Sequence, residues 1–82
     1  MTATEQQVFD FVARQFLQGE SAGLTLQTRL LELNIIDSLG VMVLLAFIER
    51  DLGVLIELED ISAGTLQDVS SIAALVDARR KP

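Results

Sequence analysis

The most apolar stretch of the chain is residues 41–48, which contain no polar side chain. Asp37 precedes this stretch and Gly53 follows it. Aspartate is a favoured helix N-cap, because its carboxylate accepts a hydrogen bond from a free N–H group of the first turn. Glycine is favoured just after a helix, since it adopts the left-handed conformation without steric cost. The pattern therefore predicts a helix over residues 38–52, with Ser38 at its first position, where free N–H groups favour a phosphate.

The apolar positions of this helix form two stripes that point in nearly opposite directions, at about 100° per residue. One stripe has the spacing of a core-facing side and consists of Val41, Leu44, Leu45, Ile48 and Leu52. The other, which we call the docking face, consists of Leu39, Met42, Val43 and Ala46. Since the first stripe suffices for a small core, we expect the docking face to be exposed to partners, with burial against another element as the alternative. Phe47 falls between the stripes and is assigned to neither.

The N-terminal region predicts a helix over residues 4–18. Two residue pairs have the spacing of a capping box at its start, Thr2 with Glu5 and Thr4 with Gln7. Its core-facing positions are Val8, Phe9, Val12 and Phe16. Gly19 is expected to end the helix.

A third helix is predicted over residues 69–79, with Asp68 as its N-cap. Its core-facing positions are Val69, Ile72, Ala73 and Val76. The basic residues Arg79, Arg80 and Lys81 suit the negative end of the helix dipole. We interpret them as a helix end rather than a nucleic-acid site.

The connections between the helices differ in length. Residues 19–36 form a long loop that is tethered by apolar side chains, with a short helical turn expected over residues 28–33. In the next link Val54 and Ile56 are expected to point inward, and residues 57–62 are expected to form one acidic turn. No segment alternates as a surface strand would. The pattern predicts an all-α bundle of three to four helices, in one domain spanning the 82 residues.

Composition and charge narrow the classes of function. The formal net charge is −6, and between residues 30 and 78 nine acids accompany one arginine. Such a field repels nucleic acid and anionic membranes and attracts basic protein partners, although acids also simply keep a small domain soluble. The chain has no histidine and no cysteine, which excludes a disulfide, an imidazole or thiolate metal site, and a Ser-His or Cys-His nucleophile pair. We expect a cytoplasmic location, since no export signal is visible. We also expect that the protein does not insert into a membrane and that it is a monomer.

The helix start lies in the stretch Ile35-Ile36-Asp37-Ser38-Leu39-Gly40. Ile48-Glu49 lies ten residues on from the Asp-Ser-Leu motif, and Gly53-Val54 lies beyond. This pattern resembles the acyl carrier protein family. It is closest to small stand-alone carriers, including aminoacyl and D-alanyl carriers. The chain departs from the family pattern at Asn34-Ile35, where many relatives have a glycine, and at Val43, where fatty-acid carriers commonly have an acid.

The resemblance implies a function and a site. In this family the serine corresponding to Ser38 carries a 4′-phosphopantetheine arm, which is derived from coenzyme A, with Asp37 and Leu39 flanking it. The arm holds an acyl or aminoacyl group as a thioester for a biosynthetic pathway, such as polyketide or nonribosomal peptide biosynthesis or D-alanylation. The implied partners are a phosphopantetheinyl transferase, a loading enzyme (an adenylating ligase or acyltransferase) and a downstream synthase or transferase. We expect them to bind the docking face, with a rim of acids at Glu49, Glu59 and Asp60. The protein itself would not be an enzyme.

Two other functions are consistent with the residues alone. An unmodified helical adaptor would bind a partner through the docking face. A small hydrolase using Ser38 is disfavoured, because the chain has no histidine base and its single lysine, Lys81, lies in the tail.

Overall fold

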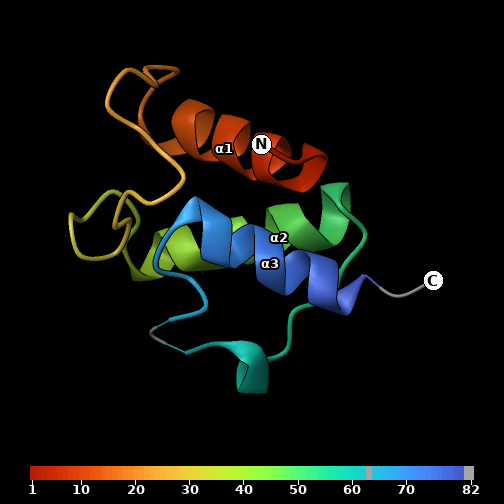
Figure 1. Ribbon diagram of the computed structural model, residues 1–82. Helices are drawn as coiled ribbons and strands as arrows, with labels where there is room; N and C mark the ends of the chain where they lie inside the picture. Colours follow the sequence, from red (N-terminus) through yellow and green to blue (C-terminus); the bar gives the residue numbers. More distant parts are fainter. Residues whose placement is uncertain (63, 81–82) are drawn as a thin grey trace.

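The computed structural model describes residues 1–62 and 64–80, and within these residues the chain forms three α-helices and one short 3-10 helix (Figure 1). These elements are α1 (Ala3–Phe16), α2 (Ser38–Asp51), η1 (Leu58–Asp60) and α3 (Val69–Arg79). The described residues contain no β-strand. The predicted all-α bundle with a long loop before α2 is therefore confirmed.

The three helices lie roughly along one direction, and α1 runs opposite to both α2 and α3 (Figure 1). The C-terminal end of α1 lies at the same end of the molecule as the first turns of α2 and α3, and the long loop between α1 and α2 covers this end. Two backbone hydrogen bonds tie the loop to the start of α3. The Leu30 N–H donates to the Gln67 carbonyl oxygen (2.8 Å), and the Ser70 N–H donates to the Leu26 carbonyl oxygen (3.0 Å). The loop that leads to Ser38 is therefore held on the start of α3.

The first helix is shorter than the predicted 4–18, and of its two candidate caps Thr2 is the one used. The Thr2 hydroxyl accepts the Glu5 N–H (3.0 Å), and Glu5 Oε1 accepts the Thr2 N–H (2.7 Å). Thr4 is instead buried, and its hydroxyl donates to Asp77 Oδ1 of α3 (2.7 Å). The helix ends at Phe16, because Gln18 and Gly19 both have positive φ angles.

The core is built from one face of each helix together with apolar side chains of the links. Its buried apolar residues are Val8, Phe11, Val12, Ala13, Leu24, Leu30, Ile36, Leu44, Phe47, Ile48, Val54, Ile56, Leu66, Val69, Ile72, Ala73 and Val76. The predicted inward positions Val54 and Ile56, and all four of α3, are confirmed. In α1 the predicted Val8 and Val12 are buried, and Phe9 and Phe16 are half-buried and pack against the core. Phe11, which was not predicted, is also buried.

Two short predicted turns are smaller in the structure than in the sequence-based expectation. Residues 28–33 form no helix. The Leu33 N–H makes one helical hydrogen bond to the Arg29 carbonyl oxygen, but the next residue, Asn34, has a φ of 59°, so the helical conformation does not continue. The acidic turn expected over residues 57–62 is the three-residue η1.

The last helix begins and ends where the sequence predicts. Asp68 Oδ1 accepts the Ser71 N–H (2.7 Å), which confirms Asp68 as the N-cap. Arg79 ends the helix and pairs with Asp60 of η1. Lys81 lies outside the described residues. Within the part of the chain that the structure describes, no helix is both long and apolar enough to cross a membrane.

Candidate functional site

The start of α2 is fixed by its cap. Asp37 has an extended backbone conformation, and its Oδ1 atom accepts the Gly40 N–H (2.8 Å). Its carbonyl oxygen accepts the Val41 N–H (2.9 Å), which begins the helical ladder. Asp37 is therefore the N-cap, and Ser38 is the first helical residue, as the sequence predicts.

Ser38 presents its hydroxyl to solvent from this rigid position. The residue is exposed, and among the hydrogen bonds of the described residues none involves the Ser38 hydroxyl. The N–H groups at the first two helical positions, Ser38 and Leu39, have no partner within the helix. Free N–H groups and the positive end of the helix dipole favour negative charge. The residues present thus fit a phosphate group bonded to Ser38 Oγ.

Gly40 brings the start of α2 into close contact with the end of α1, which the sequence did not predict. A Cβ atom at Gly40 would lie 2.9 Å from Ile36 Cγ2 and 3.0 Å from Phe16 Cε1. Both distances are shorter than an ordinary van der Waals contact. The sequence signal that could have indicated this contact is the glycine that directly follows the Asp-Ser-Leu motif. The first turn of α2, which contains Ser38, is therefore packed directly on the end of α1.

The docking face is exposed over its whole length. The exposed fractions are 73% for Leu39, 67% for Met42 and 40% for Val43, and Ala46 is also exposed. On the opposite side of α2, Leu44 and Ile48 are buried, and Val41, Leu45 and Leu52 are half-buried. Phe47, which the sequence pattern left unassigned, is buried. The two stripes of α2 therefore separate into a core side and an exposed apolar side.

The acids expected around the docking face have different surroundings. Glu49 and Glu59 are exposed. The Asp60 side chain is only 4% exposed, and its carboxylate pairs with Arg79 and accepts the Glu57 N–H (3.1 Å). The pKa of Asp60 lies below its ordinary value of 3.8. The hydrogen bond from the Glu57 N–H lowers this pKa most, burial of the carboxylate raises it, and the nearby Arg79 lowers it further. Since these contacts occupy Asp60 within the chain, the exposed acids that remain for a rim are Glu49 and Glu59.

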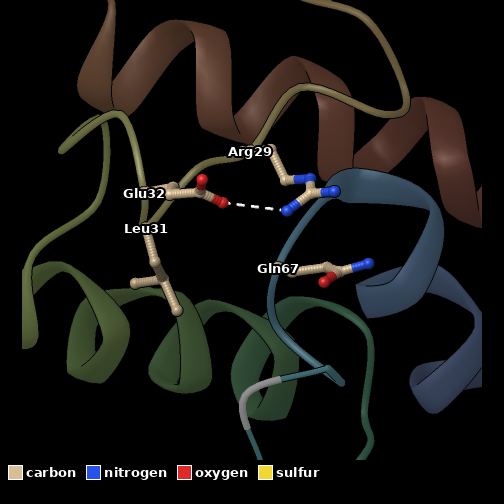
Figure 2. A pocket seen from close by; sticks show the side chains of 4 residues that line it. All are labelled: Arg29, Leu31, Glu32 and Gln67. Carbon is tan, nitrogen blue, oxygen red and sulfur yellow. Dashed lines mark hydrogen bonds and ion pairs between the residues drawn. The ribbon is translucent and has the colours of Figure 1, made fainter.

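Two hollows lie around the long loop. The first, of about 430 Å³, is lined by Arg29, Leu31, Glu32 and Gln67. Figure 2 shows the Arg29 guanidinium directed at the Glu32 carboxylate, with Leu31 pointing toward α2. The two charged side chains of this hollow, Arg29 and Glu32, form an ion pair with each other (2.9 Å). The second, of about 310 Å³, is lined by Leu17, Glu20, Gly23, Leu24 and Ile35.

Comparison with known proteins identifies the family. No protein-family model matches the chain. The chain is 39% identical over 72 residues to the probable acyl carrier protein PigG of Serratia sp. (strain ATCC 39006), and the match covers 88% of this chain and 83% of PigG. It also superimposes, with a TM-score of 0.77 and 37% identity, on a chain of a solved structure described as "Crystal structure of FAD-dependent dehydrogenase", over 83% of this chain and 96% of that one. Because the likeness to PigG extends over most of both chains and the fold is the small all-α bundle expected from the resemblance, this chain belongs to the acyl carrier protein family.

Proposed function

We propose that the protein is a carrier whose Ser38 bears a 4′-phosphopantetheine arm. The observation that carries the proposal is an exposed hydroxyl at the first residue of a capped helix. A modifying enzyme must reach this hydroxyl, and the free N–H groups of the first turn favour the charge that attachment adds. Membership of the acyl carrier protein family supports the same assignment.

The attachment is a group transfer from coenzyme A, catalysed by a phosphopantetheinyl transferase. A bond forms between Ser38 Oγ and the phosphorus nearest the pantetheine, the pyrophosphate linkage breaks, and adenosine 3′,5′-bisphosphate leaves. The hydroxyl proton passes to a base of the transferase. When attached, the group supplies a thiol that holds an acyl or aminoacyl unit as a thioester. The chain's own residues position and present this unit, and none of them is assigned a catalytic role.

The docking face is the surface that we assign to partner enzymes. It is apolar and exposed, and methionine such as Met42 adapts to partners of different shape. The exposed carboxylates of Glu49 and Glu59 favour basic surfaces and raise the rate of association. The partners of this face are the transferase, a loading enzyme of the adenylating-ligase or acyltransferase class, and a downstream enzyme of a biosynthetic pathway.

The likeness to a chain from an FAD-dependent dehydrogenase structure suggests one class of downstream partner. The described residues of the present chain form helices and no parallel sheet of the kind that binds dinucleotides in enzymes with the Rossmann fold. We therefore propose that a separate FAD-dependent dehydrogenase oxidises the acyl or aminoacyl unit while the carrier holds it. Adding the loaded carrier to such a dehydrogenase should bleach the flavin absorbance, and adding the unloaded carrier should not. Equal absorbance changes with both forms would exclude this partner.

Intact-mass spectrometry tests the site. The folded protein is incubated with coenzyme A, magnesium and a promiscuous phosphopantetheinyl transferase, alongside Ser38→Ala and the control Ser62→Ala, which removes another exposed serine. We expect the wild type and Ser62→Ala to gain one phosphopantetheine and Ser38→Ala to gain none. Modification of Ser38→Ala would show that the arm is attached elsewhere.

The exposed docking face also supports a second function, an unmodified helical adaptor. The adaptor would bind its partner with Ser38→Ala as tightly as with the wild type and would lose binding with Val43→Asp. A carrier requires Ser38 in every turnover. A partner that binds both forms equally and a wild type that accepts no arm would together favour the adaptor.

A further inference from the structure

The side chain of Phe16, the last residue of α1, meets the first turn of α2 beside its capping hydrogen bond. In that bond Asp37 Oδ1 accepts the Gly40 N–H (2.8 Å). Three side-chain atoms surround the position that a Cβ atom would take at Gly40. These are Ile36 Cγ2 at 2.9 Å, Phe16 Cε1 at 3.0 Å and Asp37 Oδ1 at 3.3 Å. The aromatic ring and the acceptor of the capping bond therefore lie on the same side of Gly40, which is itself buried.

The capping bond closes the turn that contains Ser38. Ser38 and Leu39 are the two residues between Asp37 and Gly40, and their own N–H groups have no partner within the helix. Helix ends fray readily. When the bond from the Gly40 N–H breaks, the first turn can unwind and the Ser38 hydroxyl loses its fixed direction. The direction of the hydroxyl therefore depends on the strength of this one bond.

Apolar side chains cover the capping bond on the side of α1. The bond is partly buried although Asp37 itself is exposed, because Ile36 is buried and Phe16 is half-buried next to it. A hydrogen bond in less polar surroundings is electrostatically stronger than one in water. The cap of α1 offers a contrast, since the bond from the Glu5 N–H to the Thr2 hydroxyl is exposed.

The core holds the Phe16 ring in this position. The ring lies nearly perpendicular to that of Phe11, and Phe11 in turn stacks on Phe47. Phe47 follows Gly40 by seven residues, which is about two turns further along α2. The three rings thus connect a later turn of α2, through α1, with the first turn of α2.

We propose that Phe16 is a positioning residue for Ser38. Its ring covers the hydrogen bond between Asp37 and Gly40, and this cover keeps the first turn of α2 formed while the transferase acts on the Ser38 hydroxyl. The inference rests on the proposed function, because the reaction concerned is the attachment of the arm. Most of the docking face lies beyond the first turn, so the ring supports the rate of transfer more than the binding of the transferase.

Steady-state kinetics of attachment, with a promiscuous phosphopantetheinyl transferase and coenzyme A, test this role. We expect Phe16→Ala to lower kcat about fivefold or more, because misplacement of a reacting group slows its reaction. KM for the carrier should stay within about twofold of the wild-type value. Phe16→Leu keeps an apolar side chain over the bond and should restore most of kcat. The matched control Phe9→Ala removes another half-buried ring of α1, seven residues earlier, and should leave kcat unchanged.

Amide hydrogen exchange, followed by NMR, reports on the capping bond without any enzyme. In the wild type the Gly40 amide should exchange more slowly than the Glu5 amide of the exposed cap, after correction for intrinsic rates, because a covered bond opens less often. Phe16→Ala should speed the exchange of Gly40, whereas Phe9→Ala should not. The wild-type comparison applies even where a variant does not fold.

The outcomes separate this inference from the proposed function. Equal exchange of Gly40 and Glu5 in the wild type would overturn the inference and leave the proposed function standing. A folded Phe16→Ala protein with the kcat of the wild type, or an equal fall of kcat in Phe9→Ala, would do the same. A folded wild type that accepts no arm would overturn both.

Discussion

The aromatic ring of Phe47 in α2 stacks on that of Phe11 in α1, with the ring centroids 4.0 Å apart and the planes 10° apart. A third ring, Phe16, lies nearly perpendicular to Phe11 (86°), with the centroids 5.9 Å apart. This aromatic cluster fixes the rotation of α2 about its own axis. With Phe47 turned toward α1 and with Leu44 and Ile48 buried in the core, the docking face of α2 is left in solvent.

The stack predicts a large loss of stability for Phe47→Ala. Removal of a buried phenylalanine ring typically costs about 3–5 kcal/mol, through lost transfer free energy and the cavity that remains. The free energy of unfolding, measured by urea denaturation followed by circular dichroism, should fall by this amount. Met42→Ala is the matched control on the exposed side of the same helix and should change the stability by less than about 0.5 kcal/mol. Similar losses for the two variants would mean that α2 is rotated differently.

Gly40→Ala should destabilise the start of α2. The added methyl group would press on Ile36 and Phe16, and overpacking typically costs about 1–3 kcal/mol. The helix propensity of alanine offsets about 1 kcal/mol of this cost. We expect a net loss of up to about 2 kcal/mol and slower attachment of the arm to Ser38.

Gly23→Ala provides the control for this prediction, because no described atom beyond the two neighbouring residues lies within 4 Å of a Cβ placed at Gly23. Its stability should stay close to that of the wild type. A Gly40→Ala protein as stable as Gly23→Ala, and modified at the wild-type rate, would show that α1 and the start of α2 are not closely packed.

The pair formed by Asp60 and Arg79 makes part of the stability dependent on pH. Because folding lowers the pKa of Asp60 below 3.8, its contribution is fully present above that value and is lost as the pH falls through the lower folded pKa. Asp60→Asn should therefore be less stable than the wild type at pH 7, and the difference should shrink in strong acid. Unfolding midpoints measured across the acid range check this prediction, and a difference that grows toward low pH would contradict it. Glu59→Gln, at an exposed neighbouring position, is the control.

The hydrogen bond from Thr4 to Asp77 joins the first turn of α1 to the last turns of α3. Thr4→Val keeps the volume of this buried side chain and removes the donor, which should cost about 1 kcal/mol, in the range of ordinary hydrogen bonds. A double-mutant cycle with Asp77→Ala should give a coupling free energy of similar size. Additive losses would show that the two side chains do not interact.

A charge placed in the docking face should impair partner enzymes without changing the free energy of unfolding. Val43→Asp places a charge in the docking face at an exposed position, so the free energy of unfolding should change by less than about 0.5 kcal/mol. The few interface residues that dominate binding lie near the centre of the interface, and changing one of them typically costs more than about 1 kcal/mol. We assign Val43 to this group, so kcat/KM for the transferase or the loading enzyme should fall about fivefold or more. Unchanged kinetics with every partner would remove Val43 from the interface.

The helix starts in α2 and α3 could be predicted from the sequence, because an N-cap is a local signal. Asp37 and Asp68 each stand just before a segment whose apolar positions have helical spacing, and each accepts a hydrogen bond from the N–H three residues on. The exposure of the docking face was also predictable, since one helix of this length cannot bury two opposite stripes in a small core.

What the sequence did not predict depends on contacts between distant residues. The burial of Phe11 and Phe47 follows from their stacking across two helices, and the contact at Gly40 follows from the path of the long loop. The partners of Thr4 and Asp60 are likewise distant in the sequence. Hydrophobic periodicity within one helix carries no information on such pairs.

Tryptic mapping of the modified wild-type protein would locate the arm on the chain. Cleavage after arginine releases residues 30–50 as one peptide, in which Ser38 is the only serine, while the other serines fall in residues 15–29 and 51–79. After treatment with coenzyme A and the transferase, we expect to find the phosphopantetheine mass on the peptide 30–50, with fragmentation placing it on Ser38. A phosphopantetheine found on either of the other peptides, or a folded protein that accepts none, would contradict the assignment of Ser38 as the carrier site.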